Sequence, residues 1–362
     1  MSRARGADAD GDASDPLIAV DDVEVHFEKE QGLFGLFDEP DVVQAVDGVS
    51  VDIGENDVLA LVGESGCGKT TLGKTIIGLQ EPTEGSISYR GRDIWETKAG
   101  NTDLSFDDIR SSLQIIHQDP GSSLNPNRRI VETLSEPIRL THPNVSAGER
   151  RTRIYSLLER VGMTPAEDFA SRYPHQLSGG EKQRVALARA LLMNPDVILA
   201  DEAISALDVS LRVEMMDLML DLQEEFNTSF VFISHDLSNA RYFAAHGDGR
   251  IGVMYLGNLV EVGPPDRLIS DPQHPYTEVL RWATPNLALD ASEAADPPMR
   301  KIDIPDPVNP PSGCRFHTRC PEARAVCKQE QPALRALGDD HRAACFRTDS
   351  DHRYWESDPI ED

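Results

Sequence analysis

Residues 58–79 read VLALVGESGCGKTTLGKTIIGL. The unbroken apolar run at 58–62 predicts a buried strand, and the apolar spacing over 70–79 predicts a helix. Between them lies a glycine-rich loop that fits the pattern G-x-x-x-x-G-K-[ST]. In such loops backbone N–H groups curl around a phosphate, and the positive end of the following helix attracts it. The segment therefore predicts a strand–loop–helix unit that binds a nucleotide.

The loop and the first turn of its helix supply the expected nucleotide contacts. The Lys69 ammonium is placed to reach the β- and γ-phosphates, and the Thr70 hydroxyl is placed to ligate Mg²⁺. A glycine-rich turn without function is the alternative, and the flanking strand and helix argue against it. We expect ATP to be contacted by Gly63, Glu64, Ser65, Gly66, Cys67, Gly68, Lys69, Thr70 and Thr71.

A second apolar strand, residues 197–202, reads VILADE and ends in two acids. Many buried strands end in an acid, so this pattern indicates a nucleotide site only in a chain that also contains the phosphate loop. In that combination we expect Asp201 to hold Mg²⁺, directly or through water. Glu202 is then expected to orient and polarise the attacking water as a general base.

The segment LSGGEKQR, residues 177–184, adds a second anion site. Ser178 is a candidate helix N-cap, and Gly179 and Gly180 expose N–H groups at the helix start. A single phosphate-loop fold has no use for this site, but a second subunit does, because it would cap a γ-phosphate held on its partner. An ordinary N-cap is the alternative. LSGGEKQR resembles the signature motif of ABC ATPases, which excludes a generic phosphate-loop kinase or GTPase.

Further residues match this resemblance in their spacing. It implies that Gln118, after the apolar residues 113–117, senses Mg²⁺ and water and links to a transmembrane partner. It implies that the loop 205–208, with Asp208, crosses the interface of a dimer. It also implies that His235 contacts the γ-phosphate. Either Gln118 or His235 alone would carry no information.

Strand patterns alternate with helix patterns along the chain, which indicates an α/β domain with a mainly parallel sheet. No internal repeat is present, so we expect one nucleotide-binding unit per chain. A small cysteine-containing domain follows it. The expected divisions are an acidic disordered tail at 1–16, the nucleotide-binding domain at 17–270 with a helical subdomain at about 119–178, the C-terminal domain at 271–347, and a second acidic disordered tail at 348–362.

The resemblance narrows to ATPases of peptide- and nickel-type importers, the oligopeptide/dipeptide family, over residues 17–346. This resemblance rests on the segments QDPGSSLNP at 118–126, YPHQLS at 173–178, DEAISALDVS at 201–210 and HPYT at 274–277. The phosphate loop is closer to the F-type of the two paralogous ATPases than to the D-type. This implies ATP-driven closure of a dimer, with a D-type paralogue or with itself. It also implies two permease subunits and an external solute-binding protein, with peptide, nickel or oligosaccharide as the solute.

A soluble ABC ATPase of DNA repair or of the ribosome is the competing class. Repair ATPases need a long coiled-coil insertion and ribosomal ones carry tandem ATPase units, and this chain has neither feature. One departure from the importer family concerns the adenine contact. An aromatic side chain usually precedes the AVDGVS strand, but Val42 and Val43 stand there, so Phe34 or Phe37 is the candidate replacement.

Four cysteines near the C-terminus, Cys314, Cys320, Cys327 and Cys345, are spaced C-x5-C-x6-C-x17-C. Zinc sites favour closer pairs, so this spacing argues weakly against zinc. Four thiolates can also hold a [4Fe–4S] cluster, which the resemblance implies. Cluster, zinc, and free thiols or disulfides all stay open at this point.

The chain has 62 acidic and 35 basic residues among 362, a formal charge of −27. This excess indicates adaptation to a high-salt cytoplasm, with an ordinary acidic protein as the alternative, and argues against a nucleic-acid-binding face. No apolar run approaches the roughly 20 residues of a membrane span, and the acidic N-terminus is not a signal peptide. We therefore expect a peripheral protein on the cytoplasmic face of the membrane.

The charge excess yields a first prediction. Folding stability and ATPase activity should rise from dilute buffer to molar salt, because the screening length falls from about 10 Å at 0.1 M to about 3 Å at 1 M. Thermal unfolding and turnover measured across a salt series check this. Full stability and activity in dilute buffer would contradict adaptation to high salt.

Overall fold

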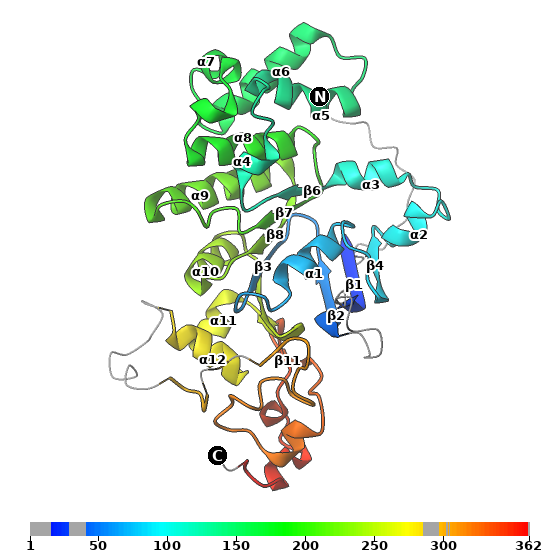
Figure 1. Cartoon of the computed structure of the whole chain (residues 1–362), viewed down its shortest axis with the longest axis vertical. Coiled ribbons are helices and arrows are strands. Elements are labelled where there is room, and N and C mark those ends of the chain that lie inside the picture. Colours follow the sequence, from blue (N-terminus) through cyan, green and yellow to red (C-terminus); the bar gives the residue numbers. More distant parts are fainter. Residues whose placement is uncertain (1–15, 29–40, 285–296, 302, 304, 361–362) are drawn as a thin grey trace, which may run out of the picture.

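A computed structural model describes residues 16–28, 41–284, 297–301, 303 and 305–360. Helices gather at one end of the molecule, two sheets occupy the middle, and the cysteine-rich C-terminal part lies at the other end (Figure 1). Within the described ranges no helix is long and apolar enough to cross a membrane. The expected N-terminal tail falls almost wholly outside the described residues.

The larger sheet has eight strands in the order β11-β12-β10-β9-β3-β8-β7-β6. Strands β6, β7, β8, β3 and β9 run parallel, which confirms the predicted α/β class with a mainly parallel sheet. β3, β7 and β8 are buried along their whole length, as their unbroken apolar runs require. The strands are β3 (Val58–Val62), β6 (Leu113–Ile116), β7 (Val197–Asp201), β8 (Ser229–Ile233), β9 (Arg250–Tyr255), β10 (Asn258–Gly263), β11 (Arg335–Gly338) and β12 (His341–Ala343).

The smaller sheet is antiparallel, in the order β2-β1-β4-β5. Its strands alternate buried and exposed residues, because one face packs on the core while the other faces outward. Helix α1 (Lys69–Ile76) contacts strands of both sheets and so places the phosphate loop where they meet. The strands are β1 (Ile18–Glu28), β2 (Val42–Ile53), β4 (Glu84–Tyr89) and β5 (Arg92–Asp93).

Helices α5, α6 and α7, within the predicted helical subdomain, pack on one another, and α5 and α6 also pack on α8. Residues 93–112 contain the short helices α2 and α3. Asp93 and Ser105 cap these helices by accepting N–H groups of their first turns. The remaining helices are α2 (Ile94–Lys98), α3 (Phe106–Ser112), α4 (Pro120–Ser123), α5 (Ile130–Thr141), α6 (Ala147–Arg160), α7 (Ala166–Ser171), α8 (Gly179–Leu191), α9 (Val209–Phe226), α10 (Leu237–His246), α11 (Pro265–Ser270) and α12 (Pro275–Trp282).

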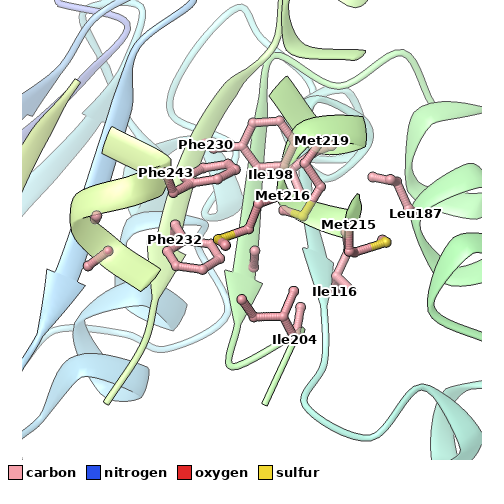
Figure 2. Close-up of a cluster of buried hydrophobic side chains, with 14 of the residues drawn as sticks. Ile116, Leu187, Ile198, Ile204, Met215, Met216, Met219, Phe230, Phe232 and Phe243 are labelled. Atoms are coloured by element: carbon pink, nitrogen blue, oxygen red, sulfur yellow. The ribbon is translucent and has the colours of Figure 1, made fainter. Parts of the chain in front are cut away.

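A cluster of aromatic and methionine side chains joins β8 to helices α9 and α10 (Figure 2). The Phe243 ring of α10 stacks on Phe232, with centroids 4.4 Å apart, and meets the edge of Phe230 at 5.7 Å. Met216 and Met219 of α9 approach the same rings and are fully buried. This packing holds β8 and its neighbours in place, so the residues at their carboxyl ends have a rigid support.

The C-terminal part contributes to the large sheet, because β12 pairs with β10, with Ala343 opposite Glu261. The tail predicted to be disordered, residues 348–362, is described in the structure through residue 360. A 3₁₀ helix at Arg353–Glu356 buries Tyr354, whose hydroxyl donates to the Glu322 carbonyl at 2.7 Å. Tyr354 provides buried apolar surface for this segment, which its acidic composition did not indicate.

Candidate functional site

The phosphate loop curves between β3 and α1. The backbone of Gly68 caps α1 with a φ of 107°, and a Cβ there would lie 2.0 Å from the Ala45 carbonyl oxygen. Lys69 is buried, and its Nζ donates to the carbonyls of Gly63 at 2.8 Å and Glu64 at 2.9 Å. The ammonium therefore lies inside the curve of the loop, while Ser65 and Gly66 are exposed at its tip.

The start of α1 meets the end of β7. The Thr70 hydroxyl donates to Asp201 Oδ1 at 2.8 Å, and Asp201 is buried. A hydroxyl and a carboxylate are the oxygen ligands that Mg²⁺ prefers. The two residues therefore fit the magnesium site predicted from the sequence.

Three predicted catalytic side chains lie together at the carboxyl ends of neighbouring strands. Gln118 Nε2 donates to Glu202 Oε2 at 3.2 Å, and His235 Nδ1 lies 3.5 Å from the same oxygen. Glu202 has a left-handed backbone, with φ 48°, and its N–H donates to the Ile233 carbonyl. Such backbone strain persists where packing enforces it and is typical of functional sites. The Glu202 carboxylate is partly exposed, so water can reach it.

The LSGGEKQR segment forms the predicted helix cap. Ser178 Oγ accepts the Glu181 N–H at 3.3 Å, and the Glu181 carboxylate accepts the Ser178 N–H at 2.6 Å. These contacts lie within the cap of α8, which Figure 1 places apart from α1 and the phosphate loop. Gly179 and Ser178 are exposed at this cap. Within one chain, the structure therefore does not bring this predicted anion site to the phosphate loop.

The loop that precedes α9 is held by a single arginine. Arg212 donates to the carbonyls of Leu207 at 2.8 Å and Ser205 at 3.1 Å. Asp208 at the N-cap of α9 and the following Val209 are exposed. The loop thus presents Asp208 outward, away from the packed core.

Val42 begins β2, where the resemblance expects an aromatic side chain. The candidate replacements Phe34 and Phe37 lie outside the described residues. The adenine contact therefore stays a prediction.

Two contacts at the phosphate loop were missed by sequence reasoning. The Tyr276 hydroxyl accepts the Glu64 N–H at 2.8 Å, and Arg319 pairs with the Glu64 carboxylate at 2.9 and 3.0 Å. Tyr276 belongs to the HPYT segment that supported the family resemblance, but the motif carried no role for it. Nothing in the spacing links Arg319 to Glu64, because the contact joins distant parts of the chain.

The four C-terminal cysteines line one pocket, together with Phe316 and Tyr354. All four are free thiols, and no three of their Sγ atoms lie within 4.8 Å of one another. Tetrahedral zinc with Zn–S bonds of about 2.3 Å would need sulfurs about 3.8 Å apart. At least some of these sulfurs therefore lie farther apart than a tetrahedral zinc site requires. Burial raises the pKa of Cys320 to about 12 and of Cys345 to about 11, so these thiols stay protonated near pH 7 unless a cation binds them.

Comparison with known proteins agrees with this geometry. The family described as "ABC transporter" matches residues 46–205. The ATP-binding cassette MJ0796, solved as a dimer in a post-hydrolysis state with ADP and Pi, is 30% identical, with a TM-score of 0.55 over 67% of this chain and 96% of that one. The cbiO1 protein of Clostridium perfringens, 24% identical, shares the fold with a TM-score of 0.58 over 74% of this chain and 96% of its own. The protein is an ABC-type ATPase.

Longer relatives narrow this class. The family "Oligopeptide/dipeptide transporter, C-terminal region" matches residues 260–327. The oligopeptide transport ATP-binding protein AppF of Bacillus subtilis is 42% identical over 91% of this chain and 96% of its own. The dipeptide transport ATP-binding protein DppF of Haemophilus influenzae is 43% identical over 87% and 92%. The chain belongs to the family of ATP-binding subunits of oligopeptide and dipeptide ABC transporters.

Two glycines of the phosphate loop provide a matched test of its geometry. Gly68→Ala should weaken ATP binding by at least about tenfold, equivalent to about 1.4 kcal/mol, because the added Cβ collides with the Ala45 carbonyl. Gly66→Ala should cost less, since a Cβ at its φ of 78° meets nothing within 4 Å. Equilibrium ATP binding to both variants checks this, and equal losses would contradict it.

Proposed function

We propose that the protein hydrolyses ATP to drive a peptide importer from the cytoplasmic face of the membrane, to which it is bound peripherally. The observation that carries this proposal is the meeting of Gln118 and His235 on the Glu202 carboxylate, beside the Thr70–Asp201 pair. The names of the relatives, which state oligopeptide and dipeptide transport, support the choice of solute class.

In this proposal the phosphate loop and Lys69 bind the β- and γ-phosphates. Thr70, Asp201 and Gln118 would hold Mg²⁺, which would neutralise charge that develops on the phosphates. Glu202 orients a water and accepts its proton as the water oxygen attacks the γ-phosphorus. The bond from that phosphorus to the β,γ-bridging oxygen breaks, and ADP leaves with the electron pair. His235 donates to the γ-phosphate and holds it in line with the water.

The signature residues act on a second subunit in this scheme. Ser178, Gly179 and Gly180 would cap the γ-phosphate bound to the partner, and Asp208 would cross the interface. The separation of the α8 cap from the phosphate loop of the same chain supports this arrangement. Val209 next to Asp208 is 75% exposed, as expected of a residue that a partner covers.

The partners follow from the same scheme. We infer a heterodimer with a D-type paralogue in preference to a homodimer, because AppF and DppF are F-type proteins in name. The helical subdomain, with α5 to α7, would contact two permease subunits, which receive solute from an external binding protein. We also infer adaptation to a high-salt cytoplasm from the charge of −27.

Glu202→Gln tests the function directly. Turnover should fall by at least about 10²-fold, because general-base assistance contributes that much, while ATP binding is retained. The variant should hold ATP in a closed dimer. Steady-state hydrolysis and equilibrium ATP binding measure the two effects, and near-normal hydrolysis would contradict the assigned role.

The same variant identifies the partners. Tagged protein purified from its own membranes with ATP should bring down permease subunits and a second ABC ATPase. A pull-down with only this chain would reject the heterodimer, and one without permease would reject the transport role.

Glu224→Gln, at an exposed carboxylate on α9, is the matched control for Glu202→Gln and should leave turnover unchanged.

We further propose that Cys314, Cys320, Cys327 and Cys345 hold a [4Fe–4S] cluster. Their shared pocket and their spacing, wider than zinc requires, support this choice. The cluster would close the loops between the cysteines and so stabilise the C-terminal part, which has only a small core of its own.

Protein purified without oxygen should then be brown and contain about four irons per chain. Replacing any one of the four cysteines by serine should remove the colour and loosen residues 312–346. Iron analysis and limited proteolysis measure both effects, with Cys67→Ser as the control that keeps its iron. Colourless protein with one zinc per chain would overturn the cluster in favour of zinc, and metal-free protein would leave free thiols or disulfides.

A further inference from the structure

Arg319 extends from the cysteine-rich part of the chain to the phosphate loop. Its two terminal nitrogens donate to the two oxygens of Glu64 at 2.9 and 3.0 Å, a bidentate pair. The Arg319 side chain is only 3% exposed and that of Glu64 is 25% exposed. The guanidinium also lies against the rings of Tyr255 and Phe316. This is a packed contact and not a mobile surface pair.

The position of Arg319 is set by the turn between two cysteines. Residues 314–320 read CRFHTRC, and the N–H of Cys320 donates to the Phe316 carbonyl at 2.9 Å. The other arginine of this turn, Arg315, donates to Asp47 at 2.6 Å and to the Leu256 carbonyl. Both arginines thus leave the cysteine turn and reach the nucleotide-binding half of the chain.

Glu64 is the second residue of the phosphate loop. The Glu64 carbonyl accepts a hydrogen bond from the Lys69 ammonium, and the Glu64 N–H donates one to the Tyr276 hydroxyl. Both backbone polar groups of Glu64 are therefore fixed by hydrogen bonds. Its carboxylate carries a negative charge close to where several phosphate charges must bind. Without Arg319 that charge would be uncompensated and would repel the phosphates through a partly buried, weakly screened region.

We propose that Arg319 is a positioning residue for ATP binding, which neutralises Glu64 and ties the phosphate loop to the cysteine turn. The proposal rests on the proposed role of residues 63–71 as the ATP site. It implies that damage to the cysteine turn reaches the phosphate loop through the Arg319–Glu64 pair. ATP affinity then depends on a part of the chain that does not touch the nucleotide.

A charge-swap series on the full-length protein tests this. Arg319→Ala should raise the Kd for ATP about tenfold, and the KM for ATP in parallel, while kcat at saturating ATP changes less than about twofold. Arg319→Lys keeps the charge and should restore most of the affinity. The double variant Arg319→Ala/Glu64→Gln removes both charges and should return Kd to within about threefold of the parent. A double variant as weak as Arg319→Ala would overturn the proposal, as would unchanged affinity in Arg319→Ala.

Arg347→Ala is the matched control. Arg347 joins the same part of the chain to Glu278 of α12 and to the Gln273 carbonyl just before this helix. Its ATP affinity should stay within about twofold of the parent, and a loss equal to that of Arg319→Ala would reduce the effect to general loosening and overturn the proposal. Lys69→Ala distinguishes failure of the proposed ATP site from failure of the proposed role of Arg319. Intact ATP binding in that variant would reject the ATP site itself.

Discussion

The parallel pairing of β3, β8, β7 and β6 is the constraint on which the rest of the structure depends. Parallel strands place their carboxyl ends at one edge of a sheet, so the loops that follow β3, β6, β7 and β8 meet there. Asp201 lies opposite Ile233 in this register, and Glu202 takes its backbone contact from the same residue. A slip of one residue in any of these strands would move a required side chain to the opposite face.

The polar side chains at this edge of the sheet differ in their exposure to solvent. Asp201, the last residue of β7, is buried, whereas the side chains that follow the two strands are more open, with Glu202 24% exposed and His235 59% exposed. A cation-binding acid needs shelter from competing water, whereas a general base must be reached by one. The same edge therefore offers environments suited to both tasks within two successive residues of β7 and its following loop.

Local chemistry explains what could be predicted from the sequence. The phosphate loop, the acid-tipped strand and the Ser178 cap each depend on neighbouring residues, and all three form as expected. The contact between Arg319 and Glu64 could not be predicted, because tertiary packing alone brings these residues together. Helices α2 and α3 could not be predicted, because they are too short to show a repeating pattern of apolar residues. The fold of residues 349–360 could not be predicted either, because this acidic segment has a single buried tyrosine.

The pairing of β12 with β10 also bears on the behaviour of the chain outside its folded state. β10 is almost fully buried, with apolar residues such as Val260 and Val262, and an open edge of this kind is a template for aggregation. β12 covers it, and β11 ends the sheet as a strand of four exposed residues. A chain cut before residue 335 would leave that edge open, so a truncation intended to isolate the ATPase would expose an apolar strand edge that favours aggregation.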